Sequence, residues 1–229
     1  MISSTSQEKV LVVAAHADDE ALGCGGTIAK HIAMGDTVQV LFMTDGVSAR
    51  SGNSAVDSEI RNTGLTCAMN VLGVNHFRCF DFPDNQMDSV PLLTVTKAIE
   101  GIIEQYQPTI IYTHFAHDLN IDHQITHQAV MTACRPIKGH SVKKIFSFEV
   151  LSSTEWNSPS QPVFTPQFIN NIDDYWLKKV QALQCYQTEL RDFPHSRSIE
   201  CIESQAVLRG ASHGFNKAEA FQVERILVP

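Results

Sequence analysis

Positive charge is scarce in this chain. Its 229 residues hold 17 lysines and arginines against 25 aspartates and glutamates, a net charge of −8 at pH 7. A protein that binds a phosphate backbone broadly needs a basic face, so the composition argues against nucleic acid as a partner. A single phosphate held in a pocket is compatible with it.

Long apolar runs are absent as well. No stretch approaches the ~20 apolar residues that a membrane span requires. The polar residues 1–9 do not resemble a secretory signal, which has an apolar region behind a basic start. None of the six cysteines forms a C-x-x-C pair, and their scatter is typical of free buried thiols in a reducing compartment; they are Cys24, Cys67, Cys79, Cys134, Cys185 and Cys201. We therefore expect a cytoplasmic protein without a membrane span.

Familiar catalytic and nucleotide-binding motifs are missing too. The chain has no G-x-S-x-G, which would mark a serine nucleophile, and no G-x-x-x-x-G-K-[ST] phosphate loop. Gly23, Gly25 and Gly26 do not make a dinucleotide fingerprint, because acidic residues fill the turn before them and would repel a pyrophosphate. These glycines instead predict close packing of the first helix on the sheet.

Apolar, β-rich runs alternate with helical stretches along the chain. Strands are expected at residues 9–15, 37–43, 76–82, 109–113, 144–151 and 222–228. Helices are expected at residues 20–34, 58–72, 91–106, 122–134 and 173–187, and residues 211–220 are interpreted as a helix or a loop. This alternation predicts an α/β fold whose mostly parallel sheet is covered by helices on both faces.

The length fits a single α/β domain over residues 1–229. Residues 152–167 are rich in Ser, Pro, Thr and Asn and indicate a long surface loop. If the chain divides at all, this loop is the best candidate for a separation between a core and a C-terminal layer.

Polar residues gather after four of the expected strands. The four clusters are residues 16–20, 44–46, 81–84 and 114–123. In an open parallel sheet, ligands bind outside the carboxyl ends of the strands. The four clusters therefore predict a single site.

The first cluster crowds His16, Asp18, Asp19 and Glu20 into five residues. An imidazole and a carboxylate can bind zinc, while a neighbouring carboxylate that does not bind the metal takes a proton from water. Ordinary capping of a helix N-terminus explains the same residues without any chemistry.

The second cluster strengthens the metal hypothesis. Four of the chain's ten histidines, His114, His117, His123 and His127, fall within fourteen residues. One of them can supply a third ligand, with an aspartate orienting its ring from behind. His123 and His127 are one helical turn apart and could share a face. Taken singly, each of these histidines is more often structural.

The segment Val12–Glu20 resembles the A-H-P-D-D-E signature of the PIG-L/LmbE family of zinc-dependent N-acetylglucosaminyl deacetylases. The resemblance continues in order to about residue 225, through residues 41–46, Arg61 with 68–73, 82–85, Asp122-His123, Arg209-Gly210 and 218–221. It implies a Rossmann-like three-layer sandwich. It also implies a hydrolase that removes an N-acetyl group from an amino sugar or its conjugate and releases acetate and a free amine.

The same resemblance assigns roles to residues. His16, Asp19 and His123 would bind zinc, and Asp18 would act as general base and then as the acid that protonates the leaving amine. Asp122 would lie behind His123. Arg61 and Asp84 would line the sugar pocket.

Three positions depart from the family pattern. Ala17 replaces a proline, Gly64 replaces the glutamate of R-x-x-E, and Asn120 replaces the first histidine of H-x-D-H. That histidine is expected to help stabilise the oxyanion. An asparagine amide can donate a hydrogen bond but not a proton. Asn120, His117 and His114 are therefore all candidate donors.

Alternatives remain open at this point. The substrate class rests on the resemblance, so an amidase acting on another N-acyl small-molecule conjugate is a second hypothesis. A Rossmann-like nucleotide-binding protein without metal is a third, and a metal-binding fold without catalysis a fourth. Fe²⁺ or another divalent metal suits the same ligands as Zn²⁺. The expected partner is a small N-acetylated sugar, and the oligomeric state is open, a homo-oligomer included.

Overall fold

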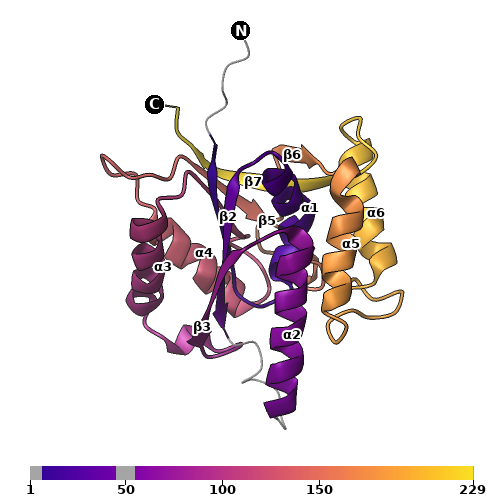
Figure 1. Cartoon of the computed structure of the whole chain (residues 1–229), viewed down its shortest axis with the longest axis horizontal. Helices are drawn as coiled ribbons and strands as arrows, with labels where there is room; N and C mark the ends of the chain where they lie inside the picture. The colour runs from indigo at the N-terminus through magenta and orange to yellow at the C-terminus, as the bar shows by residue number, and fades with distance from the viewer. Residues whose placement is uncertain (1–6, 45–54, 229) are drawn as a thin grey trace.

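Seven strands form one sheet in the order β3-β2-β1-β4-β5-β7-β6 (Figure 1). This computed structural model describes residues 7–44 and 55–228. The strands are β1 (Lys9–Ala14), β2 (Thr37–Thr44), β3 (His76–Phe82), β4 (Ile110–His114), β5 (Lys144–Phe148), β6 (Phe168–Asn171) and β7 (Ala218–Ile226). Strands β1 to β5 run parallel, and β7 pairs antiparallel with both β5 and β6. The expected α/β fold with a mostly parallel sheet is confirmed.

Helices cover both faces of the sheet. They are α1 (Asp19–Ala33), α2 (Ala55–Leu72), α3 (Leu92–Tyr106), α4 (Ile121–Ala133), α5 (Trp176–Cys185) and α6 (Ile199–Ala211). Figure 1 shows α3 and α4 on one side and α1, α2, α5 and α6 on the other. Strand β1 lies at the centre, and its residues from Val10 to Ala14 are buried because both faces are covered. No helix in the described part of the chain is long and apolar enough to cross a membrane.

The C-terminal third completes the same sandwich. After the loop, β6 and β7 extend the sheet, while α5 packs against α1 and α2. The sequence prediction missed β6 and α6. Residues 211–220 hold the end of α6, a turn and the start of β7, which begins four residues earlier than expected.

The glycines of α1 lie where the helix packs tightly. A Cβ on Gly23 would come within 2.3 Å of the Phe148 ring, and one on Gly26 within 2.9 Å of Ile172. The predicted close packing on the sheet is confirmed for Gly23, whereas Gly26 packs against the residue after β6 and Gly25 contacts Lys179 of α5. Cys24 has non-helical backbone angles (φ −147°, ψ 22°), so α1 is kinked at this point.

A buried ion pair supports the kink. The Glu219 carboxylate accepts hydrogen bonds from the backbone N–H groups of Gly26 (3.0 Å) and Thr27 (2.7 Å). Lys179 Nζ binds the same carboxylate at 2.6 Å and the Leu22 carbonyl at 2.7 Å. The kink leaves these backbone groups without their helical partners, and Glu219 and Lys179 satisfy them.

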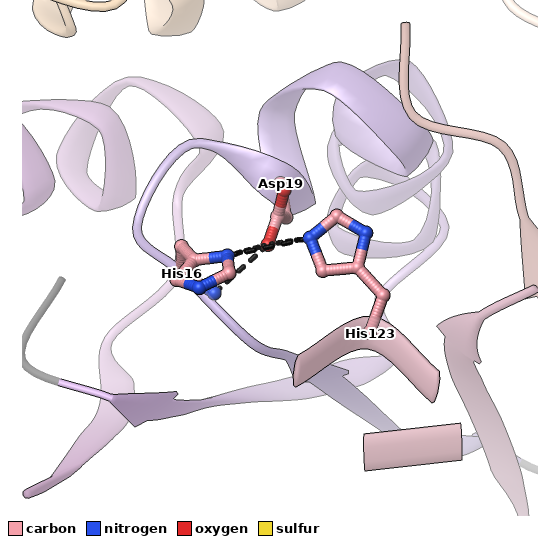
Figure 2. Close-up of side chains that lie close together, drawn as sticks. All are labelled: His16, Asp19 and His123. Atoms are coloured by element: carbon pink, nitrogen blue, oxygen red, sulfur yellow. Dashed lines mark hydrogen bonds and ion pairs between the residues drawn. The ribbon is translucent and has the colours of Figure 1, made fainter. Parts of the chain in front are cut away.

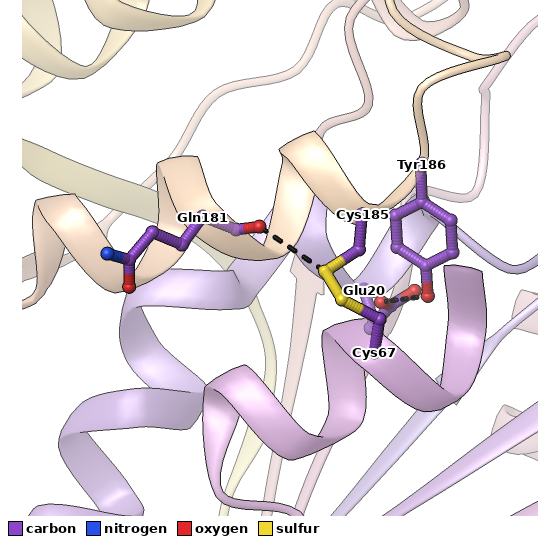
Figure 3. The surroundings of a disulfide bond; sticks show 5 residues. All are labelled: Glu20, Cys67, Gln181, Cys185 and Tyr186. Atoms are coloured by element: carbon purple, nitrogen blue, oxygen red, sulfur yellow. Dashed lines mark hydrogen bonds between the residues drawn. A yellow bond between two sulfur atoms is a disulfide. The ribbon is translucent and has the colours of Figure 1, made fainter. Parts of the chain in front are cut away.

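The expectation of six free buried thiols is wrong. Cys67 on α2 and Cys185 at the end of α5 form a disulfide (Figure 3). Cys24 and Cys134 are free and buried, whereas Cys79 is exposed and Cys201 half-buried. A spacing of 118 residues between the paired cysteines gave no local signal, because only the packing of α2 on α5 brings them together.

Candidate metal centre

The polar clusters meet at the carboxyl ends of the strands, as expected. His16 follows β1, His114 ends β4, Asp84 follows β3, and His123 lies in the first turn of α4. Thr44 ends β2 and donates hydrogen bonds to the Ala15 carbonyl, whereas residues 45 and 46 of that predicted cluster lie outside the described residues.

Three side chains converge on one point (Figure 2). Asp19 Oδ2 lies 3.2 Å from His16 Nδ1 and 3.3 Å from His123 Nε2, and the two ring nitrogens are 3.3 Å apart. Ligand atoms about 2.0–2.1 Å from a tetrahedral zinc stand about 3.3 Å from one another, so this triangle matches one face of such a site. All three residues are buried. The structure therefore brings together the three predicted ligands in an arrangement that can hold a metal ion.

A carboxylate stands behind each histidine of this trio. Asp122 Oδ2 lies 3.0 Å from His16 Nε2, and Asp84 Oδ1 lies 3.2 Å from the same nitrogen. Asp118 Oδ1 lies 3.0 Å from His123 Nδ1. Carboxylates in these positions fix the tautomer and orientation of a ligand histidine. Asp122 was expected behind His123, but it contacts His16 and Asp118 takes the expected place.

Asp122 and Asp118 are themselves held firmly. The Asp122 carboxylate accepts hydrogen bonds from the backbone N–H groups of Asn85 (2.6 Å) and Met87 (3.0 Å). Ser153 donates to Asp118 Oδ1, and Thr154 donates to Asp118 Oδ2 at 2.6 Å. The loop at 152–167, which the sequence left without a role, thus supports the second histidine.

Asp19 has the electrostatics of a ligand carboxylate. Burial opposes its ionisation, but His123 and His114 outweigh that effect and hold the pKa of Asp19 well below its usual range. Its second oxygen, Oδ1, is buried without a hydrogen-bond partner in the described part of the chain. An orphaned carboxylate oxygen in a buried site is costly, and a bound cation would remove this cost.

His123 carries the complementary shift. Burial disfavours its charged form, but Asp19 and Asp118 raise the pKa of His123 to about 9. His16, Asp19 and His123, called the trio below, and the carboxylates next to them therefore attract positive charge, whether as a proton or as a metal ion.

Asp18 does not act as an ordinary helix cap. It stands at the N-cap position of α1, yet its side chain makes no capping hydrogen bond and its backbone has φ 126°. A non-glycine residue rarely adopts this conformation, and such strain concentrates at functional sites. Asp18 Oδ2 instead binds Arg197 Nη1 at 2.8 Å. Burial raises the pKa of Asp18 to about 6, although Arg197 acts to lower it.

Glu20 lies just behind this turn. Its carboxylate accepts hydrogen bonds from the Tyr186 hydroxyl (2.7 Å, Figure 3) and from the backbone N–H of Asp18 (3.1 Å). Burial raises the pKa of Glu20 to about 8, against these two hydrogen bonds. Glu20 thus fixes the backbone that presents Asp18.

Arg61 reaches the same turn from α2. Its Nη2 donates to the Ala17 carbonyl at 3.1 Å, and its Nη1 lies 3.2 Å from Glu189 Oε1. Gly64, which replaces the glutamate of the family pattern, has no space for a side chain, because a Cβ there would lie 2.8 Å from the Cys185 carbonyl oxygen. Glu189, from the segment after α5, is the carboxylate that pairs with Arg61.

The three candidate oxyanion donors are placed differently. Asn120 caps α4 by accepting from the Asp122 N–H at 2.8 Å and donates from Nδ2 to Asn85 Oδ1 at 2.9 Å. His114 stacks on His123 with ring centroids 3.8 Å apart, and its Nε2 accepts from the Ala15 N–H. His117 is exposed, with its ring against Phe115.

His127 is a structural residue by its contacts. Its Nδ1 donates to the His114 carbonyl at 2.8 Å, so it ties α4 to the end of β4. It shares the buried side of α4 with His123 but is not among the residues that surround the metal position.

Comparison with known proteins identifies the family of this chain. The model of the PIG-L family, described as GlcNAc-PI de-N-acetylase, matches residues 11–134, a little over half of the chain. The chain belongs to the PIG-L family. The matched segment contains the three metal-position residues, Asp18 and Arg61, whereas Glu189 and Arg197 lie beyond it.

Relatives extend the likeness over most of the chain. The uncharacterized deacetylase YaiS of Escherichia coli is 29% identical over 195 residues, which cover 82% of this chain and 96% of YaiS. The 4-oxalmesaconate hydratase of Pseudomonas putida is 26% identical over 196 residues, covering 80% of this chain and 74% of the hydratase. PIG-L relatives thus include both a deacetylase and a hydratase by name.

A solved structure shows the same fold. The N,N'-diacetylchitobiose deacetylase of Pyrococcus horikoshii superimposes with a TM-score of 0.78 at 20% identity, covering 96% of this chain and 85% of that enzyme. At this identity the likeness concerns the fold, which is the Rossmann-like sandwich expected from the sequence.

The sequence did not reveal Asp118, Glu189 or Arg197 as residues of the site. Asp118 lies inside the histidine-rich cluster, and a carboxylate partner for a ligand histidine was expected there. Arg197 is 179 positions from Asp18, and no local pattern marks it.

Proposed function

We propose that this protein is a zinc-dependent hydrolase that removes the N-acetyl group from an amino sugar or amino-sugar conjugate. The observation that carries the proposal is the buried triangle of His16, Asp19 and His123, with Asp18 next to it in a strained turn. Asp18 binds Arg197 and is not one of the three residues of the trio, so it is free to act as a base. Metal-assisted hydrolysis requires such a base beside the metal site.

The reaction class is supported by the family description and by YaiS, both of which name deacetylation. The sugar class is supported by the same description, which names N-acetylglucosamine linked to a lipid headgroup. Because one relative is named a hydratase, the competing reaction is the addition of water to a carbon–carbon double bond. The test must distinguish this reaction from deacetylation.

The metal and Asp18 divide the chemistry. A bound zinc would be held by His16, Asp19 and His123, and it would acidify a water molecule and polarise the acetamide carbonyl. Asp18 takes the proton from the attacking water and returns it to the departing nitrogen, so that acetate and a free amine leave. A carboxyl group whose pKa is raised to about 6 is suited to both steps near neutral pH.

Substrate contacts are proposed for residues around this centre. Arg61 and Asp84 line the sugar side, where Arg61 is fixed by Ala17 and Asp84 by its neighbours His16 and Asn85. Asn120 is the proposed oxyanion donor, since its amide already lies at the start of α4 next to Asp122, and His117 is the alternative donor from the adjacent loop.

The test compares wild type with Asp18→Asn and Asp19→Ala on N-acetylglucosamine, N,N'-diacetylchitobiose and 4-oxalmesaconate. Release of a primary amine from a sugar substrate supports the proposal, and hydration of 4-oxalmesaconate alone contradicts it. Asp18→Asn is expected to keep its metal and lose activity by about 10²-fold or more. Asp88→Asn, an exposed carboxylate on the short turn Met87–Ser89, is the control and should match wild type.

The identity of the metal needs its own measurement. Elemental analysis of the purified protein is expected to find about one zinc per chain, because two histidines and one carboxylate suit zinc. Apoprotein reloaded with Zn²⁺ or Fe²⁺ then shows which ion restores activity. Recovery with Fe²⁺ alone would assign iron in place of zinc.

A further inference from the structure

Arg197 brings the C-terminal part of the chain into the site. It lies between α5 and α6, outside the segment that matches the family model, and its Nη1 binds Asp18 Oδ2 at 2.8 Å. The Arg197 side chain is 22% exposed and that of Asp18 is 4% exposed, so the pair is largely removed from water. A charge-assisted contact of this length in a buried setting restricts the carboxylate strongly.

Arg197 is itself fixed from two further sides. Its Nε donates to Ser152 Oγ at 2.6 Å, and its Nη1 lies 3.5 Å from Glu189 Oε2. Glu189 also binds Arg61, which holds the Ala17 carbonyl. The guanidinium is therefore set by the loop after β5 and by the segment after α5, independently of Asp18.

A very small cavity adjoins the pair. The cavity bounded by Asp18, Glu189, Arg197 and neighbouring apolar side chains measures only about 10 Å³. A cavity of that size holds at most one water molecule, so no substrate group fits inside it. Arg197 thus acts on Asp18 and not on a ligand bound in this cavity.

We propose that Arg197 is a positioning residue that fixes the side chain of Asp18 so that one carboxylate oxygen faces the attacking water. The contact occupies Oδ2 and leaves Oδ1 for the water and for the proton that it gives up. This role rests on the proposed function, because it presumes that Asp18 is the base. A misplacement of a reacting group by about 1 Å can cost about 10²-fold in rate.

The experiment uses Arg197→Ala and Arg197→Lys in the metal-loaded full-length protein, with Arg209→Ala as a matched control. Arg209 makes a comparable, partly buried ion pair with Glu149 through Nε (2.9 Å) and Nη2 (2.8 Å), away from Asp18. Measurements are kcat, KM, metal content and the free energy of unfolding, with and without added guanidinium chloride at a concentration too low to unfold the protein.

Arg197→Ala is expected to lower kcat by about 10²-fold with KM nearly unchanged, as a defect confined to the transition state requires. Its metal content should equal that of wild type, and free guanidinium should restore part of kcat. Arg197→Lys keeps the charge but not the planar fork, so it should fall between wild type and Arg197→Ala. Arg209→Ala should lose stability without losing kcat.

Two results would overturn the proposal. One is a kcat of Arg197→Ala within twofold of wild type; the other is a loss of kcat that guanidinium does not restore and that Arg209→Ala reproduces. If wild type hydrolyses no N-acetyl sugar, the proposed function fails by itself. A crystal structure of Arg197→Ala then decides the positioning role, because an Asp18 side chain that stays in place refutes it and one that turns away supports it.

Discussion

At the scale of single residues, each histidine of the trio lies against a carboxylate from outside the trio. Asp118 illustrates this, because it lies 3.0 Å from His123 Nδ1 and receives hydrogen bonds from Ser153 and Thr154. It keeps the other ring nitrogen, Nε2, turned toward Asp19. The orientation of the His123 ring is thus set by Asp118, which is not part of the trio.

Asp118→Asn should therefore weaken zinc binding by about 10- to 100-fold, since the amide cannot act as an anionic acceptor for the His123 ring. Competition with a chelator of known affinity measures the change. The control is Asp173→Asn, an aspartate that accepts hydrogen bonds from the backbone N–H groups of Asn216 and Lys217 and contacts none of the trio. Equal zinc affinity in Asp118→Asn and wild type would contradict the assignment.

The residues that could be predicted from the sequence are those whose partners are near in the chain or in a motif. His16 and Asp19 are three positions apart, and the Asp19 side chain accepts the backbone N–H of His16. His123 was found through a motif. Arg197 could not be predicted, because its link to Asp18 depends on how two loops and the segment after α5 pack.

At the scale of elements, α1 contributes Asp19 from its first turn and is kinked at Cys24. Near its kink at Cys24, α1 has two closely packed glycines, Gly23 and Gly26, and is bound by the Glu219–Lys179 pair. The first turn of the helix presents Asp19, while the part beyond the kink hydrogen-bonds to Glu219 on β7 and Asn170 on β6. Substitutions at the glycines or at the Glu219–Lys179 pair should lower the free energy of unfolding more than they lower the affinity for metal.

Gly23→Ala should destabilise the protein by about 1–3 kcal/mol, because the added methyl group overlaps the Phe148 ring and must displace it. Urea unfolding gives the free energy. Gly101→Ala on α3 is the matched control, since a Cβ there meets nothing within 4 Å. It should leave stability unchanged or raise it by up to about 1 kcal/mol. Equal effects at the two positions would contradict this account of α1.

Glu219→Gln should cost about 3–5 kcal/mol, because it leaves the Lys179 ammonium buried without its counter-charge. Combining it with Lys179→Met removes that charge and should recover much of the loss. The same unfolding measurement on the single and double variants tests this. A double variant no more stable than Glu219→Gln would show that the backbone contacts of Gly26 and Thr27 dominate instead.

Elements with weak patterns were the ones that the sequence did not reveal. Strand β6 is only Phe168–Asn171, and the Asn170 side chain bonds Lys30 and Thr27, so the strand has the composition of a loop. Helix α6 buries only Ile202, Ala206 and Gly210, a stripe too narrow to stand out. The long apolar strands and the helices with broad apolar faces were predicted to within a few residues.

At the scale of the whole molecule, one covalent link joins distant parts of the chain. Cys67 and Cys185 fix α2, which carries Arg61, to the end of α5, from which the segment leading to Glu189 and Arg197 departs. The pairing also removes part of the argument for a reducing compartment, so a cytoplasmic location stays a prediction.

Reduction of this bond should lower the free energy of unfolding by up to about 5 kcal/mol, because closing a loop of this length restricts the unfolded chain. Urea unfolding with and without reductant measures the loss, and a Cys67→Ser/Cys185→Ser variant should show no response to reductant. Alkylation of the unfolded, unreduced protein should label four cysteines. Labelling of six would contradict the disulfide.

Metal removal is the second test at this scale. A ligand that binds only the folded state at about 100 times its dissociation constant adds about 2.7 kcal/mol of stability. Chelation should therefore lower the melting temperature of wild type and leave that of Asp19→Ala unchanged. A chelator that shifts both proteins equally acts elsewhere than at the trio.

The positions of the site residues along the chain also set the order in which they are synthesised. A ribosome releases His16 and Asp19 early, but the third side chain of their triangle is 107 positions behind His16 and Arg197 is 179 positions behind Asp18. A nascent chain therefore has a pair of ligands long before it has a trio, and a trio before Asp18 has its partner. If the trio binds a metal as proposed, metal capture and catalytic competence are separate events in synthesis, and the second waits until Arg197 has emerged.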